Sequence, residues 1–157
     1  MSKRPNMIIS RGLVLSFLFF GAHAIFSFVY ADIEKTLVSW VMMQDRNITA
    51  GSILTLQEEN KFDGIIFAEK MDDKWMAGSD NWTRSENNQV KYPGWDSKMG
   101  SLVQMAIVYQ KELISIFRDG KPYASYPAKN IDLLSSENNF AVFGQRHMGG
   151  GGGIYGM

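Results

Sequence analysis

Short apolar runs separated by polar turns recur along the chain from residue 36 onward. The runs are short, and β-branched and aromatic residues are frequent in them, which is typical of β-strands. No segment has the sustained periodicity of a long amphipathic helix. The pattern predicts an all-β fold, an antiparallel sandwich or barrel. The predicted strands lie at residues 36–43, 52–57, 64–69, 75–78, 102–109, 113–118, 122–126 and 140–143.

The run 36–43 and the turn between the sixth and seventh runs allow more specific predictions. The run 36–43 is apolar at nearly every position, which predicts a strand packed on both faces, with a short buried helix as the alternative. We therefore assign Trp40 to the core. Between the sixth and seventh runs, strand-like residues flank the dipeptide Asp119-Gly120. This dipeptide favours a tight hairpin turn.

The first 31 residues have the features of a secretory signal peptide. Three basic residues precede an apolar run, and the segment contains no acid. Small-residue patterns that suit a signal peptidase end at Ala24 and Ala31. We expect cleavage after Ala31, with cleavage after Ala24 or an uncleaved membrane anchor as alternatives. The mature chain, residues 32–157, is then expected to be secreted, either extracellular or periplasmic, without a membrane segment.

Charge and composition exclude several classes of function. Residues 32–157 contain 13 basic and 16 acidic side chains, a formal charge of −3. A weakly acidic chain lacks the basic surface that binds a phosphate backbone, which argues against a nucleic-acid partner. The chain has no cysteine, which excludes disulfides, thiolate nucleophiles and cysteine-ligated metals. Its two histidines are His23 and His147, so the mature chain cannot form a multi-histidine metal site.

Several motifs resemble laminin-G-like domains, which belong to the concanavalin-A-like jelly-roll class. The resemblance spans residues 32–157 and implies an antiparallel jelly-roll sandwich of the secreted bacterial type. Its most specific part is an apolar strand followed by Asp119-Gly120, a lysine and further apolar residues. The residues that carry the resemblance are 36–41, 74–80, 103–109, 116–123 and 143–147.

The C-terminal end departs from this family pattern. Residues 149–153 are five consecutive glycines, which we expect to form a flexible loop or tail, because glycine loses the most backbone entropy on ordering. Laminin-G-like domains usually continue past such a run into a last core strand, whereas this sequence ends at Met157. The domain is therefore expected to be incomplete, with one sheet edge unpaired and apolar surface exposed.

The segment from residue 79 to residue 100 is long, polar and rich in aromatic side chains, which makes it the first candidate for a binding site. Sugars bind to an exposed aromatic ring that has hydrogen-bonding side chains beside it. The alternative is that the tryptophans pin this segment onto the sandwich, because tryptophan is usually well buried. The candidate ligand-binding residues are Trp75, Asp80, Asn81, Trp82, Arg84, Trp95, Arg146 and His147.

Metal binding and catalysis have weaker support. Related jelly-roll domains often hold calcium through loop carboxylates, so the resemblance implies Asp80 and Asp96 as candidate calcium ligands. Jelly-roll glucanases carry Glu-x-Asp-x-x-Glu on one strand, and this spacing does not occur in the chain. His147 lacks the sequence partners of a Ser-His-Asp triad. The sequence therefore predicts no catalytic residue.

These observations favour a secreted, non-catalytic module that binds carbohydrate or another extracellular ligand. Trp82 and Trp95 are the side chains expected to carry sugar binding. Two other functions stay open: an accessory domain of a larger secreted glycoside hydrolase, and a structural cell-surface domain that contacts an extracellular protein.

Overall fold

The structure is a computed structural model that describes residues 34–148 except 46, 49, 133, 135 and 136. These residues belong to one compact unit, Ile33–Met157, which contains both sheets and the whole described core. The predicted signal peptide and the five consecutive glycines lie outside the described residues. Within the part of the chain that the structure describes, no helix has the length and apolar character of a membrane span.

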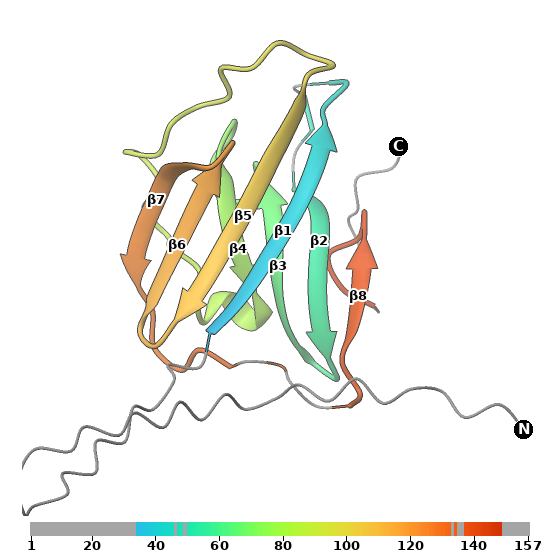
Figure 1. The fold of residues 1–157 in the computed structure, drawn as a ribbon, viewed down its shortest axis with the longest axis vertical. Coiled ribbons are helices and arrows are strands. Elements are labelled where there is room, and N and C mark those ends of the chain that lie inside the picture. The colour runs from blue at the N-terminus through green and yellow to red at the C-terminus, as the bar shows by residue number, and fades with distance from the viewer. Residues whose placement is uncertain (1–33, 46, 49, 133, 135–136, 149–157) are drawn as a thin grey trace, which may run out of the picture. The chain divides into compact units, whose positions relative to one another are not determined.

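Among the described residues, eight strands form two antiparallel sheets that pack face to face (Figure 1). The strand order is β1-β5-β6-β7 in one sheet and β4-β3-β2-β8 in the other. The predicted all-β, sandwich-like arrangement is confirmed, and every predicted strand is present with ends shifted by at most three residues. The strands are β1 (Glu34–Met42), β2 (Gly51–Glu58), β3 (Lys61–Phe67), β4 (Trp75–Ser79), β5 (Leu102–Gln110), β6 (Leu113–Arg118), β7 (Lys121–Pro127) and β8 (Phe140–Phe143).

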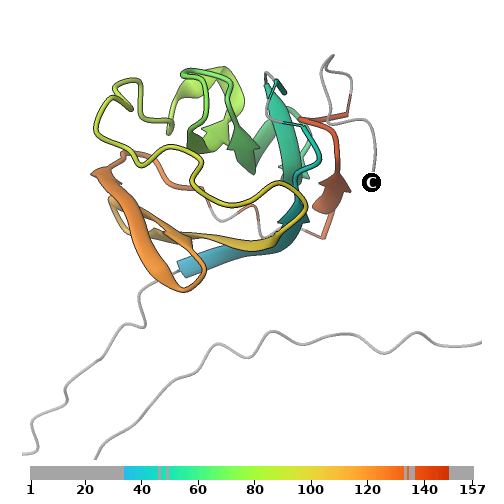
Figure 2. The ribbon, with the colours of Figure 1, turned by 90° about the horizontal axis from the view of Figure 1, so that it is seen from above.

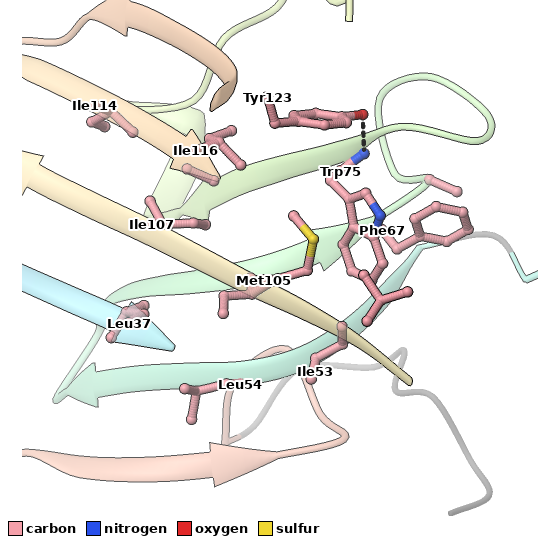
Figure 3. Close-up of a cluster of buried hydrophobic side chains, with 14 of the residues drawn as sticks. Leu37, Ile53, Leu54, Phe67, Trp75, Met105, Ile107, Ile114, Ile116 and Tyr123 are labelled. Atoms are coloured by element: carbon pink, nitrogen blue, oxygen red, sulfur yellow. Dashed lines mark hydrogen bonds between the residues drawn. The ribbon is translucent and has the colours of Figure 1, made fainter. Parts of the chain in front are cut away.

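Alternation along the strands builds the core between the sheets. In β5, Val103, Met105 and Ile107 are at most 1% exposed, and the residues between them face outward. Successive side chains of a strand point to opposite faces, so this alternation turns one face of β5 toward the second sheet. Phe67 and Trp75 meet it from β3 and β4 (Figure 3). The main core cluster therefore lies between the two sheets, and the opposite face of β3 and β4 is buried as well, with Ile66 and Met76 at most 1% exposed.

The hairpin between β6 and β7 has the predicted turn. Asp119 and Gly120 both have positive φ, 50° and 72°, and the strands pair up to Arg118 opposite Lys121. Two consecutive left-handed residues are the requirement of a tight type I′ turn, which glycine and aspartate tolerate best. The Asp119 carboxylate also accepts a hydrogen bond from the Gln104 backbone N–H at 2.9 Å, which ties the turn to β5. The hairpin prediction is confirmed.

Strand β1 differs from the prediction in which faces it buries. It is a strand, and Leu37 faces the core with 7% exposure. Its other face is open, because Val38, Trp40 and Met42 are 40%, 58% and 50% exposed. The prediction that this strand packs on both faces and places Trp40 in the core is wrong. No further layer of the described residues covers the outer face of its sheet.

The long segment 80–101 covers the inner side of β7 (Figure 2). The Tyr123 hydroxyl accepts the Trp75 backbone N–H at 3.0 Å and donates to the Pro93 carbonyl at 2.6 Å. The Tyr126 hydroxyl donates to the Arg84 carbonyl at 2.9 Å. Both tyrosines are less than 10% exposed. The segment therefore acts as a third wall of the core and is held there by two phenols.

Tyr123 predicts how stability depends on alkaline pH. Burial raises its pKa to about 12, whereas the phenol of an unfolded chain ionises near pH 10. The folded state keeps this proton where the unfolded state has lost it, so the contribution of Tyr123 to stability is expected to fall, by at most roughly 3 kcal/mol, as pH rises from about 10 to 12. Urea unfolding across this interval should show a smaller fall for Tyr123→Phe. An unchanged fall in that variant would contradict the assignment.

Candidate functional site

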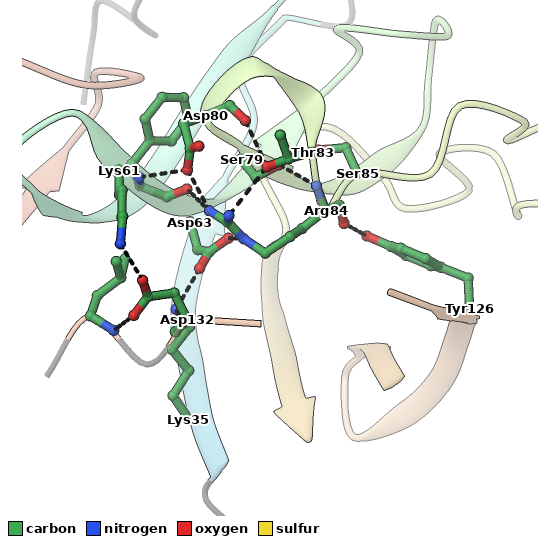
Figure 4. Close-up of polar contacts among 12 residues, drawn as sticks. Lys35, Lys61, Asp63, Ser79, Asp80, Thr83, Arg84, Ser85, Tyr126 and Asp132 are labelled. Atoms are coloured by element: carbon green, nitrogen blue, oxygen red, sulfur yellow. Dashed lines mark hydrogen bonds and ion pairs between the residues drawn. The ribbon is translucent and has the colours of Figure 1, made fainter. Parts of the chain in front are cut away.

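A buried ion network lies where β1, β3 and the 80–84 turn meet (Figure 4). The Asp63 carboxylate on β3 has no exposed surface. It accepts a hydrogen bond from the Lys35 ammonium on β1 and one from Arg84 Nε at 3.0 Å. Because β1 and β3 belong to different sheets, this carboxylate joins the two layers of the sandwich.

Arg84 holds the turn that precedes it. Its guanidinium donates to the Phe62 carbonyl at 3.0 Å, to Asp80 Oδ1 at 2.5 Å and to Thr83 Oγ1 at 3.2 Å, besides Asp63. Asp80 in turn accepts the Phe62 backbone N–H at 3.2 Å. Arg84 is only 6% exposed. Two of the predicted ligand-binding residues, Asp80 and Arg84, therefore fix the local backbone with their side chains.

Burial sets the charges of this network. It raises the pKa of Asp63, and the neighbouring Lys35 and Arg84 oppose that rise. It lowers the pKa of Lys35, against the attraction of Asp63. Burial alone would lower the pKa of Arg84 as well, but Asp63 and Asp80 outweigh it and the pKa is raised. Each charge is thus tolerated only because its partners are present.

The short 3-10 helix η1 (Asp80–Trp82) presents Trp82 on a strained backbone. Asn81 and Trp82 have φ of 48° and 59°, in the left-handed region. This region is unfavourable for a bulky residue such as tryptophan and costs about 1–3 kcal/mol. The Thr83 N–H donates to the Asp80 carbonyl at 3.1 Å, and the Ser85 N–H to the Trp82 carbonyl at 3.2 Å. The ion network below the turn therefore maintains a conformation that the local sequence disfavours.

Two cations flank the Trp82 ring. The Lys70 ammonium and the Arg146 guanidinium each lie 4.1 Å from the ring centroid. Both distances are well within the range of cation–π attraction. Trp82 is half-buried and Lys70 is exposed, so this arrangement reaches the surface. We call it, with its immediate neighbours, the Trp82 cluster; its members are Phe62, Glu69, Lys70, Trp82, Arg146 and His147.

The remaining members complete the cluster. Arg146 pairs with the Glu69 carboxylate, and burial raises the pKa of Glu69 against the opposing charge of Arg146. The His147 ring stacks on Phe62 with centroids 4.9 Å apart. Glu69 Oε2 and Arg146 Nε are buried and have no hydrogen-bond partner among the described residues. The cluster therefore contains one unused acceptor and one unused donor next to an aromatic ring.

Trp75 and Trp95 lie in the core. Trp75 is fully buried and Trp95 is 5% exposed. Their ring centroids are 6.0 Å apart, and Phe67 contacts both rings. The Arg118 guanidinium covers Trp95 with its carbon 5.1 Å from the ring centroid. Neither indole offers a face on which a sugar could stack, so the structure favours the alternative that these two tryptophans pin the long segment.

The structure does not bring the two candidate calcium ligands together. Asp80 follows the Ser79 end of β4 and binds Arg84. Asp96 pairs with Arg118 at 2.5 Å, at the end of the sandwich where Trp75 and Trp95 pack. Among the described residues, no three Asp, Glu or His side chains are grouped closely enough to hold a metal ion. The two carboxylates thus form separate ion pairs.

Sequence reasoning found part of the Trp82 cluster. It named Trp82, Arg146 and His147 as ligand residues, and these three lie together although 64 positions separate Trp82 from Arg146. It assigned Asn81 as well, which is exposed on the same turn. It missed Phe62, Glu69 and Lys70. A faint signal existed, because Glu69 ends the third predicted strand and Lys70 opens a turn rich in charge.

No model of a known protein family matches the chain, and a search of curated proteins finds no relative. The laminin-G-like resemblance therefore stays a prediction.

Proposed function

We propose that the chain is a non-catalytic binding module that recognises carbohydrate through the Trp82 cluster. The observation that carries the proposal is the Trp82 ring, held on a strained backbone at the surface between Lys70 and Arg146. Strained conformations persist where surrounding structure enforces them, and they gather at binding sites. An aromatic ring beside hydrogen-bonding side chains is the arrangement that suits a sugar.

The charge of the cluster favours an acidic sugar. Lys70 and Arg146 are two cations against the one carboxylate of Glu69, so the cluster carries an excess positive charge. A carboxylate or sulfate on the sugar would meet that charge, and charged hydrogen bonds of this kind are among the stronger ones. Lys70 is exposed, so its ammonium can move from the ring to such a group.

The proposal includes the architecture and the compartment. We infer an antiparallel jelly roll for the two-sheet sandwich, on the strength of the hairpin motif around Asp119-Gly120 and the order of strands in the sequence. We also infer export of residues 32–157 through the leader at residues 1–31, which places the module outside the cell or in the periplasm. Its expected partner is then an extracellular polysaccharide.

The test is glycan-array binding with neutral, uronic-acid and sulfated sugars. The expected result is binding to the acidic sugars, lowered about tenfold or more by Trp82→Ala, since one stacking contact contributes roughly 1 kcal/mol beyond its area. Lys70→Gln should weaken binding to acidic sugars and make it less sensitive to salt. Titration calorimetry of the best sugar measures both effects.

Trp40→Ala is the matched control, because Trp40 is an exposed tryptophan on the outer face of the opposite sheet. It should leave the affinity unchanged. Equal losses from Trp40→Ala and Trp82→Ala would reject the cluster as the site. Absence of binding to every glycan by folded protein would reject carbohydrate as the ligand.

A structural role is the second candidate function, and a specific observation favours it. Trp75, Trp95 and Tyr123 hold the long segment against the core instead of presenting it to solvent. A spacer or protein-contact module needs such a rigid surface and no sugar site. Binding to one defined extracellular protein, together with no binding to any glycan on the array, would favour this candidate.

A further inference from the structure

The two sheets are offset by one strand. Across the core, β1 lies over β2, β5 over β3 and β6 over β4. With orders β1-β5-β6-β7 and β8-β2-β3-β4, this matching leaves β7 overhanging at one side and β8 at the other. The end-on view shows both overhangs, with β7 and β8 at opposite sides of the sandwich (Figure 2). Each overhanging strand has an inner face that no strand of the other sheet covers.

The overhang at β7 is covered. Tyr123 and Tyr126 point inward from β7, are 8% and 6% exposed, and bind the carbonyls of Pro93 and Arg84 in the long segment. That segment occupies the place that a fifth strand of the second sheet would take. The molecule therefore fills one of the two overhangs with its own chain.

The overhang at β8 is open among the described residues. Phe143 pairs with Leu54 and Ala141 with Leu56 in the β2–β8 ladder. Directly opposite residues share a face of the sheet, and Leu54 and Leu56 pack in or against the core, so Phe143 faces inward. Yet Phe143 is 65% exposed. An inward phenylalanine is exposed to this extent because none of the described strands lies across from it.

The open place is bordered by the free edge of β1. Among the described residues β1 pairs with β5 alone. Natural edge strands are usually short or carry proline or charge that blocks further pairing, and β7 at the other edge has Pro122, Pro127 and Lys121. Strand β1 has nine residues, and none of residues 36–42 is charged or proline. The charged residues of β1, Glu34 and Lys35, lie at its start, so the edge along residues 36–42 lacks the features that normally prevent the addition of a strand.

We propose that the β1 edge accepts one further extended strand from a partner protein, which completes the first sheet under Phe143. The strand would hydrogen-bond to the free backbone groups of β1. Its inner side chains would be aliphatic, since they would pack on Phe143 and Ala141. Its outer side chains would continue the exposed apolar row of Val38, Trp40 and Met42. The uncharged edge selects a strand without charge along about seven residues.

A whole second copy of the chain does not fit this place. In a β1-to-β1 dimer, the β1 of one copy would lie across from β8 of the other. Its own β2 must lie across from the same strand, because β2 faces β1 in every copy. The two strands β8 and β2 would then occupy one position. A single strand, which brings no second sheet with it, avoids this conflict.

The test appends a nine-residue strand of alternating valine and threonine to the C-terminus of the full chain. A flexible Gly/Ser linker of about 20 residues, which spans roughly 25 Å, lets it reach the edge. The expected result is a rise in Tm of about 5 °C or more and slower amide hydrogen exchange in residues 36–42. The same strand with proline at its centre should give neither effect, because proline breaks the ladder.

Two phenylalanines of β8 provide a matched pair of variants. Phe143→Asp places a charge on the inner face and should abolish the rise in Tm, whereas Phe140→Asp, on the outer face, should preserve it. Each variant is measured with and without the appended strand, so its own cost cancels. No rise in Tm, or the same rise in both variants, overturns the proposal. Sedimentation of the unmodified chain as a dimer with protected β1 amides also overturns it.

Discussion

Replacing Asp63 by alanine is expected to lower the free energy of unfolding by about 3–5 kcal/mol. The substitution removes the carboxylate that Lys35 and Arg84 share and leaves both cations, whose side chains are 9% and 6% exposed, without it. Arg84 cannot lose its charge, because a guanidinium stays protonated at any accessible pH. Urea unfolding, followed by circular dichroism, measures the loss.

The exposed ion pair Lys61–Asp132 is the matched control. Its side chains are 60% and 36% exposed and 2.7 Å apart, and Asp132 takes part at the rim of the same network. Exposed pairs contribute about 0–1 kcal/mol, so Asp132→Asn should cost little. Equal losses from Asp63→Ala and Asp132→Asn would contradict the assignment of the stability to the buried carboxylate.

The same network connects stability with the candidate site. Arg84 holds Asp80 and the Phe62 carbonyl, and the η1 turn that bears Trp82 starts at Asp80. Loss of Asp63 should therefore loosen the Trp82 turn as well as the join between the sheets. The sugar affinity of Asp63→Ala should fall even though Asp63 itself faces the interior.

The strands could be predicted from sequence because their signal is local. In β5 the alternation of buried and half-buried residues follows directly from the alternation of side-chain directions in a strand. The turn at Asp119-Gly120 likewise depends on two residues that tolerate positive φ. Which other parts of the chain cover each face of a strand depends on contacts between distant residues, so the local sequence does not predict it. Trp40 lies on an apolar run, yet the described residues provide no layer to cover it.

The candidate site could be predicted only in part for the same reason. Trp82, Arg146 and His147 are unusual residues in polar segments, and composition alone marks them. Their contact with Glu69 and Lys70 depends on how the chain crosses the second sheet, which no spacing reveals. The segment 79–100 is both a candidate site and a wall of the core. The sequence does not distinguish Trp82, which reaches the surface, from the buried Trp75 and Trp95, which pack this segment against the core.

Trp75→Ala is expected to cost about 3–5 kcal/mol of unfolding free energy, the usual range for removing a buried tryptophan. Trp75 is fully buried and contacts Phe67 and Trp95, so its loss leaves a cavity between β4 and the long segment. The hydrogen bond from its backbone N–H to Tyr123 does not involve the side chain and is kept. Urea unfolding and near-ultraviolet circular dichroism measure the effect.

Two control substitutions distinguish the loss of core packing at Trp75 from the loss of a tryptophan as such. Trp40→Ala removes an exposed tryptophan and should change stability little, since surface substitutions usually stay within about 0.5 kcal/mol. Trp75→Phe keeps most of the packing and removes an indole N–H that has no hydrogen-bond partner among the described residues, so it should cost clearly less than alanine. If Trp75→Phe costs as much as Trp75→Ala, the assignment of the stability to the packing that phenylalanine keeps is wrong.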